Sequence, residues 1–209
     1  MKLKVSQMKT SLLSLIAGSV IALSPLAPAL AQEAGSLTLG FGLGAVMPKD
    51  NNGDLAGARA DIGNNIRPTL TLEYFIRDNI GIELLAAAPF KHSISLAGSG
   101  EIGETKHLPP TLSVNWHIPT GGALTPFVGL GINYTKFFEE RSGLGQLKIK
   151  DSFGLAATIG VDYAISEKAA LRADLRYIDI DSDVYLDGAH IGKTSVDPLV
   201  TSISYVMKF

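Results

Sequence analysis

The stretch KHLPPTLSVNWHIP, residues 106–119, alternates apolar and polar side chains with a period of two. Its even positions from Leu108 to Ile118 are apolar or proline, and its odd positions from Thr111 to His117 are polar. This period predicts a β-strand. Two consecutive prolines, Pro109 and Pro110, stand inside the pattern, although proline has no N–H to donate to a strand ladder. The stretch therefore predicts a strand whose pairing is interrupted.

The same alternation recurs along the chain. Short connections (77–79, 119–123 and 164–168) alternate with long polar ones (48–66, 93–105, 138–149 and 181–195). Bacterial outer-membrane barrels connect their strands in this way, with the short turns on the periplasmic side. The sequence therefore predicts an all-β fold, an eight-stranded antiparallel transmembrane β-barrel with short periplasmic turns and long extracellular loops. The expected strands are roughly 36–47, 66–76, 80–92, 105–118, 124–138, 149–163, 169–180 and 196–209.

The first 31 residues have the pattern of an export signal. A lysine-containing start precedes an apolar run, which ends at Ala29-Leu30-Ala31. This pattern predicts a secretory signal peptide, residues 1–31, cleaved after Ala31, and a mature domain of residues 32–209. The chain has no cysteine, so disulfides do not stabilise it. Its formal net charge is −2 without a basic cluster, which argues against a nucleic-acid partner.

Alternation alone does not decide which face of the sheet is buried, but the aromatic residues do. Some lie near the short-turn end of their strands, and others lie eight to ten residues further along. Nine residues climb on the order of 23 Å in a tilted strand, the height of an apolar band between two aromatic girdles. We therefore expect apolar side chains to face lipid in the bacterial outer membrane. The expected girdle residues are Tyr74, Trp116, Tyr163 and Phe209 at the periplasmic end, and Phe90, Tyr134 and Tyr177 at the other end.

The inward-facing positions predict two different levels of the lumen. Charged residues concentrate in the periplasmic half and are expected to form an ion-pair network that fills it. They are Glu73, Glu83, Asp162, Arg172, Asp174 and Arg176. Smaller or apolar residues are expected to line the upper half and leave room there for an apolar solute. They are Gly40, Gly42, Gly44, Val46, Leu85, Ala87 and Phe137. No spacing supports a metal site, and no cofactor is expected.

Four features of the sequence are similar to those of a known family. They are APFKH (88–92), LPPTLSVNWH (108–117), TPFVGLGINYTKFFEE (125–140) and the terminal Phe209. They resemble the OmpW family of small outer-membrane barrels, which includes the alkane-uptake proteins. The resemblance implies an eight-stranded barrel with a narrow, largely hydrophobic lumen. It also implies passage of small hydrophobic molecules across the outer membrane, with a lateral exit into the bilayer. The ending TSISYVMKF, residues 201–209, also looks like the C-terminal signature that the barrel assembly machinery reads.

Strand register suggests a role for the prolines. Counting from the short turns places Pro89 opposite Pro109, with Pro110 beside them, between the third and fourth strands. Three residues without an N–H donor then face one seam, and unpaired backbone is costly inside a bilayer. The prolines either open a gap in the wall or mark where the strands leave the membrane. The family resemblance favours the gap, and hence a passive channel with lateral exit.

Two other functions remain open. A structural, adhesive or receptor barrel would act through its extracellular loops and would fill its lumen at every level. A lipid-modifying enzyme would use His107 and His92 with Ser93 or Ser95 and Glu104 nearby. We expect no enzymatic activity. We expect a monomer that contacts outer-membrane lipid, lipopolysaccharide and small hydrophobic solutes.

Overall fold

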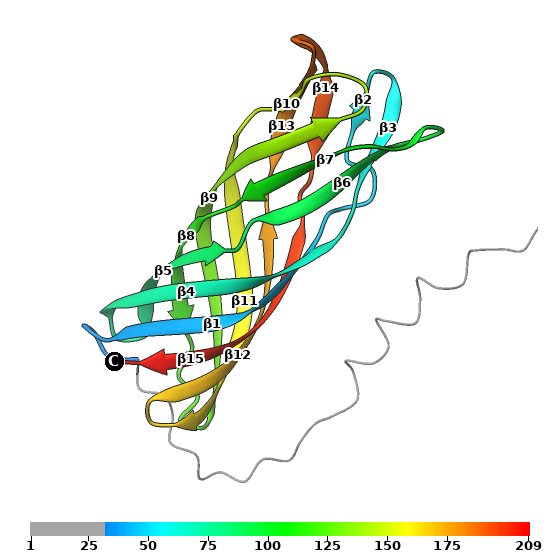
Figure 1. Ribbon diagram of the computed structural model, residues 1–209. Helices are drawn as coiled ribbons and strands as arrows, with labels where there is room; N and C mark the ends of the chain where they lie inside the picture. The colour runs from blue at the N-terminus through cyan, green and yellow to red at the C-terminus, as the bar shows by residue number, and fades with distance from the viewer. Residues whose placement is uncertain (1–31) are drawn as a thin grey trace, which may run out of the picture.

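The protein is a closed antiparallel barrel in the computed structural model, which describes residues 32–209 (Figure 1). The predicted signal peptide, residues 1–31, lies outside the described residues. The first strand pairs with the last from Thr38↔Lys208 to Met47↔Leu199, and this seam closes the ring. The structure thus confirms the predicted eight-stranded barrel. Around the ring the strands are β1 (Leu37–Met47), β4 (Asn65–Arg77), β5 (Ile80–Ala87), β8 (Thr111–His117), β9 (Leu124–Ser142), β11 (Ser152–Ser166), β12 (Ala169–Ile178) and β15 (Leu199–Lys208).

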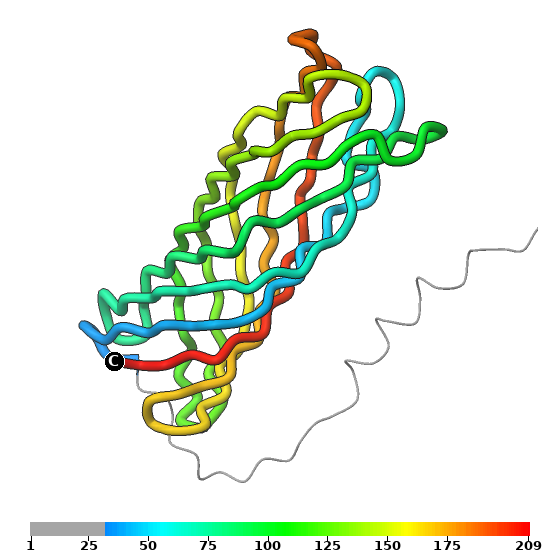
Figure 2. The backbone as a smooth tube through the Cα atoms, viewed as in Figure 1, coloured from blue at the N-terminus to red at the C-terminus, as the bar shows by residue number. Residues whose placement is uncertain are grey.

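A second tier of strands continues the wall beyond this ring, as the backbone trace in Figure 2 shows. The long polar connections were expected to be loops, but most of their residues form paired strands. Residues 97–99 and 187–188 make the turns of two such hairpins. A polar sequence does not prevent pairing, because paired strands satisfy each other's backbone N–H and C=O groups. The added strands are β2 (Asp54–Leu55), β3 (Ala58–Ile62), β6 (Phe90–Leu96), β7 (Gly100–Leu108), β10 (Leu147–Ile149), β13 (Asp181–Leu186) and β14 (Ala189–Ser195).

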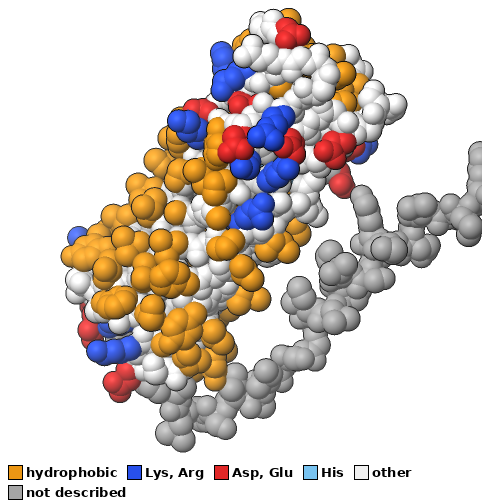
Figure 3. Space-filling view, in the orientation of Figure 1, with side chains coloured by type: hydrophobic (Ala, Val, Ile, Leu, Met, Phe, Trp, Pro, Cys, Tyr) orange, Lys and Arg blue, Asp and Glu red, His pale blue; other side chains and the backbone are white. Residues whose placement is uncertain are grey.

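The two faces of the wall have opposite chemistry. Leu130, Phe153 and Ile203 are each about 70% exposed on the outer face, whereas Glu73 and Arg172 are at most 3% exposed inside. Figure 3 shows hydrophobic side chains covering the lower part of the visible face and charged ones gathered higher up. The outward assignment of the apolar positions is therefore confirmed. No helix among residues 32–209 is long and apolar enough to cross a membrane.

Most of the expected girdle aromatics project from the wall. Tyr74, Trp116, Tyr134, Tyr177 and Phe209 are exposed, and Tyr163 is half-buried.

Phe90 was expected in the outer girdle, and that prediction is wrong. Its side chain is only 2% exposed and packs inside the barrel. The pattern changes at Ala88–Pro89, where β5 ends and β6 begins. Even-numbered residues such as Leu84 face outward on β5, but Phe90 and His92 face inward on β6. An interruption of this kind in a strand shifts which residues face the core.

Candidate functional site

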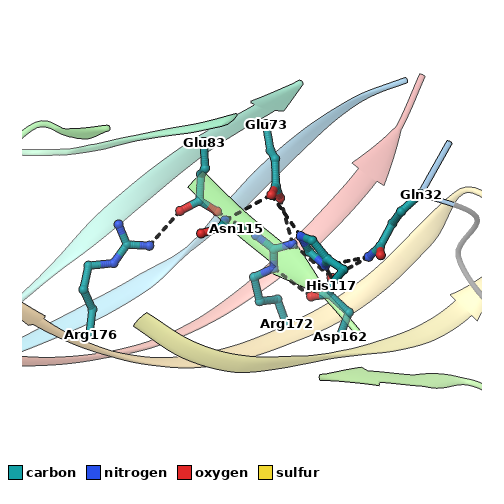
Figure 4. Close-up of polar contacts among 8 residues, drawn as sticks. All are labelled: Gln32, Glu73, Glu83, Asn115, His117, Asp162, Arg172 and Arg176. Carbon is teal, nitrogen blue, oxygen red and sulfur yellow. Dashed lines mark hydrogen bonds and ion pairs between the residues drawn. The ribbon is translucent and has the colours of Figure 1, made fainter. Parts of the chain in front are cut away.

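The base of the lumen is filled by charged side chains centred on Arg172 of β12 (Figure 4). Its Nε and Nη2 atoms donate to Asp162 over 2.7 and 3.0 Å. Nη1 donates to Glu83 over 2.7 Å, and Nη2 also reaches Glu73 over 3.1 Å. Arg176 donates to the other oxygen of Glu83 over 2.7 Å. Three buried carboxylates thus share two buried guanidinium groups.

Three further residues complete this network, and sequence analysis did not assign them to it. Asn115 and His117, both on β8, donate to Oε1 of Glu73 over 3.0 and 2.9 Å. Gln32 lies 2.7 Å from Nδ1 of His117 and donates to it, so Nε2 carries the imidazole proton. The inward parity of Asn115 and His117 could have placed them at this level. Gln32 precedes the first strand, where no alternation indicates its position.

Aromatic rings support the network from beside it. The guanidinium of Arg172 lies over the ring of Phe127 at 4.5 Å from its centroid, and His117 stacks on the same ring at 5.0 Å. A cation over an aromatic face is attracted by the ring quadrupole. Asp174 was expected in the network, but it takes part in none of these hydrogen bonds or ion pairs and is half-buried.

The upper-lumen glycines do not leave the space that was expected of them. A Cβ added to Gly42 would lie 2.8 Å from Cα of Ser204, and one added to Gly44 would lie 2.9 Å from Cγ2 of Thr69. At Gly40 it would overlap the hydroxyl of Thr71. These glycines therefore admit neighbouring side chains and backbone rather than an open cavity.

Above the charged base, the lumen holds an apolar cluster. It includes Val46 and Phe137, both predicted to line the lumen, together with Phe90. Ala87 packs against this cluster, and Leu85 is buried. The cluster also contains Ile149, Ile178, Ile180, Val184 and Val196, which the sequence analysis did not assign to it.

A small cavity lies within this region. It is about 20 Å³ in volume, and its lining is apolar except for His92, His107 and two threonines, Thr105 and Thr194. The rings of His92 and His107 lie 4.8 Å apart between centroids, and each is 2% exposed. The two histidines named for a lipid-modifying enzyme are therefore neighbours in the structure.

The ladder between the third and fourth barrel strands is interrupted beside this cavity. β5 and β8 pair up to Leu85↔Thr111, and pairing resumes between β6 and β7 at Phe90↔His107. Pro89, Pro109 and Pro110 lie in the interval. The predicted register was off by one: extending the β6–β7 pairing places Pro89 opposite Leu108 rather than Pro109.

The proline carbonyls at this interruption find partners elsewhere. Pro89 accepts a hydrogen bond from Nε of Arg67 over 3.0 Å. Pro110 accepts from the backbone N–H of Tyr134 and from the side chain of Asn133, each over 3.1 Å. The wall is thus interrupted without leaving these carbonyls unpaired, which would be costly in a membrane.

Strand pairing is also interrupted at a second place in the wall, between the β12–β13 junction and the β14–β15 junction. Backbone hydrogen bonds still connect the two sides of this second seam. There, Ile178 N–H donates to the Pro198 carbonyl over 3.3 Å, and Val196 N–H donates to Ile180 over 2.9 Å. Between residues 86–89 and 108–110, by contrast, neither a strand pair nor a backbone hydrogen bond crosses the seam. The proline-rich seam is therefore the less tightly joined of the two.

His92 and the serines considered for a lipid-modifying enzyme lie on opposite faces of β6. His92 faces the lumen, while Ser93 and Ser95 occupy alternate positions on β6 and so lie on the opposite face. Glu104 forms an ion pair with Lys91. Among residues 32–209, no group of three or more His, Cys, Asp or Glu side chains could hold a metal ion.

A sequence model of the OmpW family matches residues 33–209. The chain belongs to the OmpW family. Outer membrane protein W of Vibrio cholerae is 37% identical to it, over 91% of this chain and 96% of that one. Outer membrane protein AlkL of Ectopseudomonas oleovorans is 31% identical, over 74% of this chain and 71% of that one.

Solved structures agree with this assignment. The crystal structure of the outer membrane protein OprG from Pseudomonas aeruginosa matches with a TM-score of 0.76 and 34% identity, over 87% of this chain and 99% of that one. This OmpW-family barrel is therefore an outer-membrane protein, and its exposed apolar band lies in the lipid bilayer. The resemblance, the fold and the location expected from the sequence are all confirmed.

Proposed function

We propose that this barrel is a passive channel for small hydrophobic molecules, which leave it sideways into the bilayer between β5/β6 and β7/β8. The interrupted ladder between Leu85↔Thr111 and Phe90↔His107 carries the proposal. It lies beside a cavity of the upper lumen that has a largely apolar lining. An apolar solute that leaves through this interruption breaks no strand pairing.

The charged base supports a lateral exit. Arg172 bridges carboxylates from three strands, and all of these groups are at most 3% exposed. Moving an apolar solute through this network would break several charge-assisted hydrogen bonds. We propose that the network seals the periplasmic end, so that the lower lumen is structural and the solute path ends above it.

The proline residues offer a direct test. Replacing Pro89, Pro109 and Pro110 with valine supplies three N–H donors and β-branched side chains, which favour pairing across the seam. Uptake of octane by cells producing the triple variant should fall several-fold relative to wild type. Pro198→Val changes the bridged seam and is the matched control, in which uptake should stay near the wild-type rate. Heat-modifiable migration on gels would verify that each barrel is folded.

Unchanged octane uptake in the triple variant would overturn the lateral exit. The prolines would then mark where strands three and four leave the apolar band, the second interpretation that the sequence allowed.

A structural or adhesive barrel is the second candidate, and the packed lumen favours it. Apolar side chains fill most of the upper half, and the cavity is only about 20 Å³. Equal octane uptake with and without the protein would support this function instead. Neither function requires a cofactor or chemistry by the chain, and we propose that the protein is not an enzyme.

The outer surface above the apolar band suggests contact with lipopolysaccharide. Lys91, Lys106 and Arg141 lie there in ion pairs with Glu104 and Glu139. Lysine and arginine side chains form charge-assisted hydrogen bonds with phosphate groups such as those of lipopolysaccharide. We also propose that the protein acts as a monomer and that its signal peptide, residues 1–31, is removed after Ala31.

A further inference from the structure

Three buried polar atoms converge on the small upper cavity without a hydrogen-bond partner among the described residues. They are Nε2 of His92, Nε2 of His107 and the hydroxyl of Thr194. Each of these residues is at most 3% exposed, and the rest of the lining is apolar apart from Thr105. Buried polar groups are nearly always paired, so this concentration of unpaired atoms indicates a binding site.

The hydrogen bond on the far side of His92 defines what its Nε2 can bind. Nδ1 of His92 contacts the backbone carbonyl of Gly63, and a carbonyl oxygen can only accept. Nδ1 therefore carries the proton, and Nε2 presents a lone pair to the cavity. Burial lowers the pKa of His92, which keeps the ring neutral. A ligand at this atom must consequently donate a hydrogen bond.

The cavity adjoins the interrupted seam. His107 and Phe90 form the first strand pair beyond the interruption, and both rings pack together at 5.6 Å between centroids. A volume of about 20 Å³ holds one water-sized group. A hydroxyl group fits this space, and the unpaired stretch of the seam begins at Leu108, the residue next to His107.

We propose that this cavity binds the hydroxyl group of a small apolar alcohol as the molecule passes to the lateral exit. The O–H group donates to Nε2 of His92, and the oxygen accepts from the Thr194 hydroxyl. This inference rests on the proposed channel function and names its preferred substrate class. An alkane leaves both of these polar atoms unpaired. A carboxylate has no proton to donate and carries its charge into an apolar site, so it binds worse.

Nitrogen-15 spectra of the four histidines test this inference directly. The protein would be reconstituted in lipid nanodiscs and titrated with 1-octanol, octane or octanoate. We expect 1-octanol alone to shift the Nε2 resonance of His92. His117, in the charged base, and His190, which is exposed, serve as internal references and should not move. Equal shifts with octane and 1-octanol, or no shift with either, would overturn hydroxyl recognition.

A competition assay separates this inference from the channel function. In cells given both solutes, His92→Phe should lower the uptake of 1-octanol relative to octane by about tenfold. The variant lacks Nε2, the atom that accepts the hydrogen bond from the alcohol. His92→Asn retains a side-chain acceptor and should restore part of the preference. An unchanged uptake ratio in His92→Phe would refute the hydroxyl site while octane uptake still upheld the channel. Histidine shifts without any octane uptake would refute the channel and leave the site standing.

Discussion

Glu83 and Arg172 meet across the lumen at 2.7 Å, although their strands, β5 and β12, lie four places apart in the ring of eight. Glu73 on β4 and Asp162 on β11 face each other in the same way, and Arg172 contacts both. One guanidinium group therefore ties together opposite sides of the barrel. The planar guanidinium group holds its N–H donors in fixed directions and can bind several carboxylates at once. The single ammonium group of a lysine does not have this geometry.

Replacing Arg172 with leucine should destabilise the barrel strongly. The variant leaves Glu73, Glu83 and Asp162 with only the guanidinium of Arg176, and uncompensated buried charge costs about 3–5 kcal/mol. Arg176→Leu is the matched control. It removes a single contact, to a Glu83 that keeps Arg172, and should cost about 1–3 kcal/mol. Urea unfolding in lipid, followed by the fluorescence of the single tryptophan, would measure both free energies. Equal losses of unfolding free energy in the two variants would show that the network does not depend specially on Arg172.

The glycines on β1 should differ in how they tolerate a methyl group. At Gly42 a Cβ would meet Ser204 Cα at 2.8 Å and the Ile203 carbonyl, and this β15 backbone cannot move without opening the closing seam. We expect Gly42→Ala to lower the free energy of unfolding by about 1–3 kcal/mol. At Gly44 the nearest atom is the end of the Thr69 side chain, which can rotate away, so Gly44→Ala should cost less than Gly42→Ala. The same unfolding measurement in lipid would compare the two variants, and the reverse order would contradict this packing argument.

The barrel could be predicted from the sequence because one face of every strand meets lipid. Apolar residues therefore recur at every second position whatever packs on the inner face, as the exposed Leu112, Val114 and Trp116 of β8 show. The charged base was also partly predictable, because Glu73 and Arg172 share the inward parity. Gln32 was not, since it lies before any periodic segment.

The upper half of the barrel was harder to predict. Its strands look polar because their outer face meets water, so β6, β7, β13 and β14 resembled loops. The interruption at Pro89 then reversed the parity of β6 and moved Phe90 and His92 to the inside. Which residues face inward after such an interruption depends on the local backbone geometry. The period of two in the sequence does not reveal that geometry.

The stability of the barrel should fall below neutral pH through the two cavity histidines. Burial lowers the pKa of His107 to about 3 and also lowers that of His92, whereas an unfolded histidine titrates near 6.5. The unfolded chain therefore binds more protons below about pH 6.5, and stability falls as pH decreases toward the folded pKa values. The rings of the two histidines lie side by side, and the positive charge of Arg67 also lowers the pKa of His92.

Unfolding measured from pH 7 to 5 would test this dependence. Each histidine that stays neutral should contribute a loss of up to about 1.4 kcal/mol per pH unit. His107→Phe should flatten the pH profile, whereas the exposed His190→Phe should leave it unchanged. An identical slope in wild type and His107→Phe would contradict the assignment to the buried ring.

The C-terminal Phe209 should matter for assembly more than for stability. Its side chain is 70% exposed and its backbone pairs with Leu37, so the ring itself adds little packing inside the protein. Phe153 is 69% exposed on the same outer surface and is a matched control. Phe209→Ala and Phe153→Ala should therefore refold into lipid vesicles with similar free energies of unfolding. We propose that the assembly machinery reads the terminal aromatic, and we therefore expect only Phe209→Ala to lower the amount of folded barrel in the outer membrane of cells several-fold. Membrane fractionation with heat-modifiable migration would measure this amount, and equal levels of the two variants would rule out a recognition role for Phe209.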